Sequence, residues 1–224
     1  MLSQNTFTFY VSDFGASKIY LFSSNWNYLS NNYVSHPTSI ISIGDFFYII
    51  TDQNGGYLCK TNISFNVLNQ YNFTSGESGF YYDLYYDLTA NLIYVSDNAL
   101  SLILVFDLNL ILQGSITIPQ YKLSTISGYN NAIYVGTFNG TVIILVNKTV
   151  AYSFDVCNNN TKITSIVFDQ FGFMAISCSD HIYLYYSNGT SANQRMAVLN
   201  PKYIGFDSNG YFVVLLDSQI NLYF

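Results

Sequence analysis

The stretch Leu92-Ile93-Tyr94-Val95-Ser96-Asp97 is an apolar run that ends in an acidic residue, and related stretches recur along the 224-residue chain. Each is followed by a second apolar run. Counted at the small or acidic residue that ends each stretch, the repeats are 39, 45, 40, 40 and 40 residues apart. A repeat of about 40 residues built from short strands is typical of a β-propeller, so the sequence predicts this fold with six blades. The six end residues are Asp13, Asp52, Asp97, Thr137, Ser177 and Asp217.

The amino-acid composition favours strands throughout. Half of the residues are hydrophobic and 18% are aromatic, with 22 Tyr and 18 Phe, which suit the half-buried surface of a sheet. Strong helix formers are scarce, since Glu77 is the only glutamate and Arg195 the only arginine. We therefore expect an all-β chain with a single domain over residues 1–224, a length that one propeller accommodates.

Each repeat is predicted to hold four antiparallel strands, called a, b, c and d in chain order. In the third repeat these are residues 81–86, 92–96, 101–107 and 111–118. The chain opens on a strand b and closes on a strand c, so its first and last blades are predicted to be incomplete. Either three-stranded blades close the propeller, or the chain is a piece of a longer protein. Residues expected to be buried on strands b and c include Tyr94, Ile133, Ile143, Ile176, Tyr183 and Leu215.

The charge pattern excludes some classes of partner. Only 9% of the residues are charged, the formal net charge is −6, and the seven Lys and Arg residues are scattered singly. Nucleic acids and anionic membrane surfaces are both bound through clustered cations, so we expect neither as a partner. No apolar window reaches the roughly 18 residues of a membrane helix, so no membrane insertion is expected. The N-terminal residues Met1 to Gln4 show no signal-peptide pattern.

The repeats resemble those of the NHL family of β-propellers over nearly the whole chain, and the last repeat matches most of the family pattern. The shared pattern is a proline, an apolar strand, Asp-x-x-Gly, an apolar strand ending in aspartate, and a final apolar strand. Members of this family are chiefly binding platforms for proteins and ligands, and a minority are metal-dependent hydrolases or lyases. Members that bind RNA use a basic face, which this sequence lacks. The matching residues are Pro201, Ile204, Asp207, Gly210, Val213 to Asp217, Ile220 and Phe224.

Catalytic and metal-binding patterns are sparse. Zinc needs a cluster of His, Cys or carboxylate ligands, and His36 and His181 lie far apart in the sequence. Calcium needs six to eight oxygen ligands. The carboxylates that end equivalent strands are calcium candidates, but we interpret each as a cap of its own b–c turn. No Gly-x-Ser-x-Gly motif is present. We expect a protein that is not an enzyme and has no cofactor, with calcium as the alternative. The calcium candidates are Asp13, Asp52, Asp97 and Asp217.

Six Asn-x-Ser/Thr sequons make N-glycosylation a hypothesis, although chance predicts nearly as many in this composition. Asn139 and Asn188 fall in predicted turns and are expected to be exposed, and we expect them to carry sugar if a eukaryotic cell secretes the chain. An intact mass equal to that of the bare chain after such secretion would contradict this. The other sequons begin at Asn62, Asn72, Asn147 and Asn159.

The three cysteines do not form a disulfide framework. We interpret Cys59, Cys157 and Cys178 as small buried thiols, because free cysteine packs as a small hydrophobic residue. Pairing of Cys157 with Cys178 remains open, since one ends a repeat and the other lies early in the next.

These patterns favour an extracellular or cell-surface propeller that is a scaffold or interaction module. Its most specific form is a self-assembling subunit of a filament or array, because few charges separate the copies and an incomplete blade leaves strand edges open. The alternatives are a propeller that binds carbohydrate or another small ligand, and a calcium-dependent hydrolase. The candidate interface residues are the aromatic side chains Trp26, Tyr223 and Phe224.

Overall fold

A computed structural model describes residues 8–23, 25–52, 56–73, 81–157, 161–206, 212–216 and 220–223. Within these ranges the regular secondary structure consists of strands alone, and none of it is helical. Consequently, these residues contain no helix that is long and apolar enough to cross a membrane.

The strands form six small sheets in chain order, and neighbouring strands in each sheet are antiparallel. The first sheet contains β1 (Thr8–Asp13), β2 (Lys18–Ser23) and β3 (Tyr28–Tyr33), and the second contains β4 (Pro37–Ile43), β5 (Phe46–Thr51), β6 (Tyr57–Asn62) and β7 (Val67–Asn72). The third contains β8 (Tyr81–Asp87), β9 (Leu92–Asp97), β10 (Leu102–Phe106) and β11 (Leu112–Thr117). The fourth contains β12 (Leu123–Tyr129), β13 (Ala132–Thr137), β14 (Thr141–Val146) and β15 (Thr149–Asp155). The fifth contains β16 (Ser165–Phe168), β17 (Phe173–Ser177), β18 (His181–Tyr186) and β19 (Ser191–Ala197), and the sixth contains β20 (Tyr203–Phe206), β21 (Phe212–Leu215) and β22 (Ile220–Tyr223).

This organisation confirms the predicted β-propeller with incomplete first and last blades. The first blade has strands b, c and d, and the last has strands a, b and c, whereas the four blades between them have all four. Apolar runs and turn residues are local information, which is why the sequence located the strand ends within about three residues.

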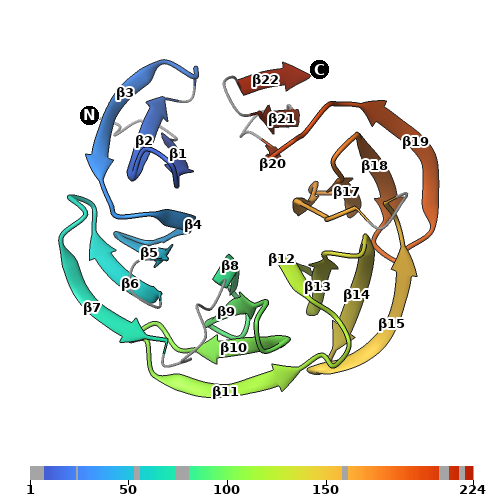
Figure 1. Cartoon of the computed structure of the whole chain (residues 1–224), viewed down its shortest axis with the longest axis horizontal. Helices are drawn as coiled ribbons and strands as arrows, with labels where there is room; N and C mark the ends of the chain where they lie inside the picture. The colour runs from blue at the N-terminus through green and yellow to red at the C-terminus, as the bar shows by residue number, and fades with distance from the viewer. Residues whose placement is uncertain are drawn as a thin grey trace. The chain divides into compact units, whose positions relative to one another are not determined.

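The chain divides into two compact units, which are described separately. Unit 1 comprises residues 1–81 and 109–111 and contains the first two blades, in which β1 contacts β4. Unit 2 comprises residues 82–108 and 112–224 and contains the strands of the last four blades. In unit 2, β12 contacts β9 and β16, and β16 contacts β20. Figure 1 shows β12 and β20 at the inner edge of this unit and β15 and β19 at its outer edge. The expectation of a single domain stays a prediction.

The core lies between the faces of neighbouring blades. One cluster in unit 2 joins strands of the third and fourth blades and includes Ile103, Val135 and Ile143. Of the residues expected to be buried, Tyr94, Ile133, Ile143 and Ile176 are buried, and Tyr183 and Leu215 are intermediate. Four of these six residues are buried as expected, but consecutive residues of β9 and β13 are buried on both faces of the strand, so burial does not test the predicted register.

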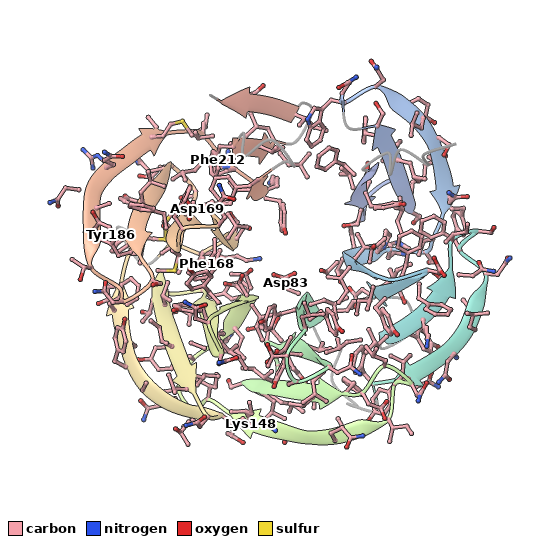
Figure 2. The ribbon with its side chains drawn as sticks, turned by 180° about the vertical axis from the view of Figure 1, so that it is seen from behind. Asp83, Lys148, Phe168, Asp169, Tyr186 and Phe212 are labelled. Carbon is pink, nitrogen blue, oxygen red and sulfur yellow. A yellow bond between two sulfur atoms is a disulfide. The ribbon has the colours of Figure 1, made fainter. Side chains whose placement is uncertain are left out.

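Short turns connect the strands as the turn residues predict. The Asp169 side chain accepts hydrogen bonds from the N–H groups of Phe171 and Phe173, both at 2.8 Å, and closes the a–b turn of the fifth blade. The hairpin between β14 and β15 turns at Asn147 and Lys148, which have φ angles of 52° and 63°. Two successive positive φ angles are typical of a type I′ turn, whose twist matches that of the flanking strands. Figure 2 shows Lys148 at the outside of unit 2.

A disulfide bond joins Cys157 to Cys178, so the interpretation of these residues as free thiols is wrong. Cys157 follows β15 and Cys178 follows β17, and folding brings their Cα atoms to 5.8 Å from each other. The bond thereby ties the end of the fourth blade to the fifth. Cys59 is a buried free thiol, as interpreted.

Candidate functional site

The inner surface of unit 2 brings polar side chains together from the first strands of successive blades. At its centre is Asp83 on β8, which Figure 2 labels at the inner side of unit 2. Its Oδ2 accepts hydrogen bonds from the Thr125 hydroxyl at 2.6 Å and from the Ile126 N–H at 3.2 Å, both on β12. Its Oδ1 accepts a third from the Leu84 N–H at 2.9 Å. The carboxylate is thus held in one orientation between two blades.

Lys162 lies within electrostatic range of this carboxylate, and Lys202 lies within electrostatic range of Lys162. Burial lowers the pKa of Lys162 from its ordinary value of 10.5, the negative charge of Asp83 opposes this, and the positive charge of Lys202 adds to it. The Lys162 Nζ also lies 4.7 Å from the centre of the Phe138 ring, a cation–π distance. We name Asp83, Thr125, Lys162 and Lys202 the inner polar cluster. Its charges can hold and orient an anionic group, which is a binding role rather than a chemical step.

Sequence reasoning missed the inner polar cluster because its members are distant in the chain. One pattern in the sequence could have indicated the cluster. Lys122, Lys162 and Lys202 are 40 residues apart, the period of the repeat, and each shortly precedes the first strand of its blade. Three of the seven cationic residues therefore recur at one position of the repeat, although the chain as a whole is acidic.

Replacing Asp83 with asparagine is expected to lower the free energy of unfolding by about 1–2 kcal/mol, because hydrogen bonds to a charged acceptor become neutral ones. It should also lower the pKa of Lys162 further, since the Asp83 charge raises that pKa. The pKa of Lys162 in the folded variant then lies further below its unfolded value of 10.5. The unfolded state therefore binds more protons between these two values, so the stability that the variant has lost relative to wild type should be recovered as the pH rises through this window. Denaturant unfolding at several pH values measures both effects.

Asp155→Asn is the matched control. The Asp155 Oδ1 accepts a hydrogen bond from the Thr141 hydroxyl at 2.7 Å, but Asp155 is exposed, so its loss should cost less than about 1 kcal/mol. Equal losses of unfolding free energy in the two variants would show that the hydrogen bonds of Asp83 contribute no more to stability than those of an exposed aspartate.

Two of the four calcium candidates are placed as turn caps. The Asp13 Oδ1 accepts a hydrogen bond from the Ala16 N–H at 2.8 Å, and the Asp97 Oδ1 accepts one from the Leu100 N–H at 3.1 Å. Burial raises the pKa of Asp52, and His36 partly offsets this. Asp217 lies outside the described residues. Within the described ranges, no group of three or more His, Cys, Asp or Glu side chains could hold a metal ion.

The two histidines have separate local surroundings. The His36 Nδ1 lies 3.0 Å from the Ser35 hydroxyl, and its ring meets the edge of Phe14 at 5.1 Å. The His181 Nδ1 lies 2.9 Å from the Asp180 Oδ2, without the alignment of a hydrogen bond. Neither arrangement assembles a metal site or a catalytic triad.

The predicted interface aromatics are only partly described. Trp26 is half-buried and stacks on Phe9, with ring centres 4.1 Å apart. Its indole N–H has no hydrogen-bond partner within the described chain. Tyr223 lies at the end of β22, but its side chain and all of Phe224 are outside the described residues. An interface role for these residues stays a prediction.

The sequons lie mostly at the surface. Asn139 and Asn188 are exposed, which confirms the expectation for these two turns, and Asn72 and Asn147 are exposed as well. Asn62 is half-buried, and its Oδ1 accepts hydrogen bonds from two backbone N–H groups of its own turn. Asn159 lies outside the described residues.

The outer strands share two features. We use this name for strand d of the first five blades: β3, β7, β11, β15 and β19. Asp155 and Arg195 are the only charged residues in these strands, and none contains proline. Every outer strand has a bulge where it pairs with strand c. Bulges twist an edge away from a flat pairing geometry, so these edges are protected against strand addition although they lack charge.

Comparison with known proteins supports the fold. No model of a protein family matches the sequence, and no curated protein matches it. Among solved structures, 1323 chains are similar, so the fold is widely shared and does not by itself define an activity. One of these, the structure of a streptogramin B lyase, matches with a TM-score of 0.76 and 15% sequence identity over 99% of this chain and 78% of that chain. At this identity the likeness shows the fold alone: the chain is a β-propeller.

Proposed function

We propose that this protein is a non-enzymatic, extracellular or cell-surface propeller of the NHL type that acts as an interaction scaffold and assembles with further copies of itself. One observation carries the proposal. The β22 strand occupies position c of the last blade and pairs only with β21 among the described strands. In the other five blades, a bulged outer strand covers the strand in this position. The β22 edge can therefore accept a strand.

The composition of the outer strands supports contacts with another protein. Their exposed apolar side chains are interspersed with uncharged polar ones, so little charge repulsion opposes the approach of a second copy. Since bulges protect the backbone of these strands, contact there would use side chains. Exposed apolar residues on them include Tyr28, Leu29, Tyr33, Val67, Leu68, Leu112, Val150 and Tyr152.

The hydrogen bonds of the candidate catalytic carboxylates support a binding role. The Asp13 and Asp97 carboxylates each cap a turn, and Asp83 is held by three hydrogen bonds. A catalytic carboxylate or metal ligand needs lone pairs directed at a substrate or ion. The lyase with a similar structure shares only the fold with this chain, so its activity is not transferred.

Two features support an extracellular location. Disulfides such as Cys157–Cys178 persist in oxidising environments and are rare in reducing ones. The exposed sequons at Asn139 and Asn188 are positioned where a glycan attaches without disturbing the core.

Light scattering over a range of protein concentrations tests the proposal. Wild type should form oligomers that grow with concentration, and Leu222→Lys should weaken assembly at least about tenfold, because a charge on an edge strand opposes strand pairing. Leu199→Lys is the matched control, since Leu199 is 78% exposed and lies outside the strands. A wild type that stays monomeric, or a folded Leu222→Lys variant that assembles as wild type does, would refute self-assembly.

A further inference from the structure

A groove in unit 1 opens between the first and second blades. Its volume is about 490 Å³, within the range of small-molecule sites. One wall comes from the end of β3 and the connection to β4, and the other from β5, β6 and β7. Ile49 and Thr51 on β5, and Tyr57, Cys59 and Thr61 on β6, line it because alternate residues of a strand share a face. The inner part of the same face packs against Ile19 of the first blade, so the groove is the part that the first blade leaves uncovered.

The lining of the groove is uncharged. Among the described residues, its lining combines aromatic side chains with hydroxyl and amide groups and includes no Asp, Glu, Lys, Arg or His. Lys60 lies between Cys59 and Thr61 in sequence, but its Nζ is 4.4 Å from the Phe46 ring, and it does not line the groove. A charged ligand would lose its hydration without gaining an opposite charge, so the groove favours a neutral ligand.

One buried polar group in the groove lacks a partner. Thr61 is 2% exposed, and its hydroxyl oxygen has no hydrogen-bond partner within the described part of the chain. An unsatisfied buried hydroxyl is uncommon and costly, and a molecule bound beside it would supply the missing hydrogen bond. The hydroxyl oxygen is itself buried, so the proposed hydrogen bond requires the staggered χ1 position of Thr61 that turns the hydroxyl towards the groove.

The wall opposite Thr61 supplies an aromatic surface. Tyr33 lines the groove and is 75% exposed, so its ring is accessible before any ligand binds. A purely apolar ligand could cover Tyr33, but it would leave Thr61 unsatisfied and also cover the Gln70 amide. A sugar ring has C–H faces that pack on an aromatic ring and hydroxyl groups that both donate and accept hydrogen bonds.

We propose that this groove binds a neutral saccharide of one or two rings, which packs on Tyr33 and hydrogen-bonds to Thr61 and Gln70. The site is in unit 1 and does not involve β22. Its test is therefore independent of the self-assembly proposed above, and either proposal can fail alone.

Saturation-transfer NMR with lactose, cellobiose, maltose and diacetylchitobiose tests the proposal. At least one of these probes should bind with a dissociation constant below about 10 mM. Tyr33→Ala and Thr61→Val should each weaken that binding by about threefold to tenfold, the range for one aromatic contact or one hydrogen bond. Tyr28→Ala is the matched control, because Tyr28 is an exposed tyrosine of the same strand that does not line the groove.

Cys59 gives a second readout that does not depend on a variant. It lines the groove and is the free cysteine of the chain, and burial raises the pKa of its thiol to about 11. Alkylation by N-ethylmaleimide at about pH 9 should therefore be slow, and a bound saccharide should slow it at least about threefold further.

Thr61→Val also tests whether the Thr61 hydroxyl lacks a hydrogen-bond partner in the protein without sugar. Without sugar, this variant should melt at the wild-type temperature or up to about 4 °C higher, because it removes a hydroxyl that lacks a partner. The proposal is overturned if none of the four saccharides binds folded protein at about 10 mM. Binding that Tyr33→Ala leaves unchanged, or that does not protect Cys59, overturns it equally.

Discussion

Replacement of Ile143 with alanine is expected to lower the free energy of unfolding by about 2–5 kcal/mol. Ile143 lies on β14 with no exposed surface, in the cluster that also contains Ile103, Val135 and Leu145. The smaller side chain loses the transfer free energy of three carbon atoms and leaves a cavity, because strands on both sides are held by their own ladders. Urea unfolding followed by circular dichroism measures the loss.

Ile63→Ala is the matched control for this substitution. Ile63 is 68% exposed in the turn between β6 and β7, so the same chemical change should alter stability by less than about 0.5 kcal/mol. A loss below about 1 kcal/mol for Ile143→Ala would mean that the interface between the third and fourth blades is loosely packed.

The double substitution Cys157→Ala and Cys178→Ala is expected to lower the free energy of unfolding by about 3 kcal/mol. The disulfide closes a loop whose ends are 21 residues apart in sequence, and the loss of this restraint increases the conformational entropy of the unfolded chain. For a chain of this length, the melting temperature should fall by about 6–12 °C.

A reducing agent provides the control for the disulfide. It should lower the melting temperature of wild type towards that of the double variant and leave the double variant unchanged. If wild type melts at the same temperature with and without reductant, while mass spectrometry shows that the bond has been reduced, the disulfide does not contribute to stability.

The structural similarity to a streptogramin B lyase and the sequence repeat both indicate a β-propeller, but neither identifies an activity. A fold shared at 15% identity fixes where strands lie, whereas function depends on which side chains converge. In this chain the convergent groups are the inner polar cluster and the lining of the groove. The first contains charged side chains and the second contains none among its described residues, and the substitutions proposed above test both.

The strands, their order and the incomplete blades could all be predicted from local sequence patterns. The run Leu92 to Asp97 is apolar and ends in an acidic residue, and β9 covers those residues. Such patterns are local, because the residues of each strand and of the turn after it indicate which positions are buried and where the turn begins. Turn caps such as Asp13 and Asp169 were predictable for the same reason, since the partner N–H groups lie within four residues.

Contacts between distant residues emerged only when the blades were packed together. Asp83 and Thr125 are 42 residues apart in sequence, and Cys157 and Cys178 are 21 apart. The groove likewise depends on how much of the second blade the first one covers. Composition and periodicity carry no information on these distances, because they depend on how neighbouring blades pack and on the lengths of the connections between them. The repeat therefore predicted the architecture of this protein, whereas the packing of one blade on the next created its candidate sites.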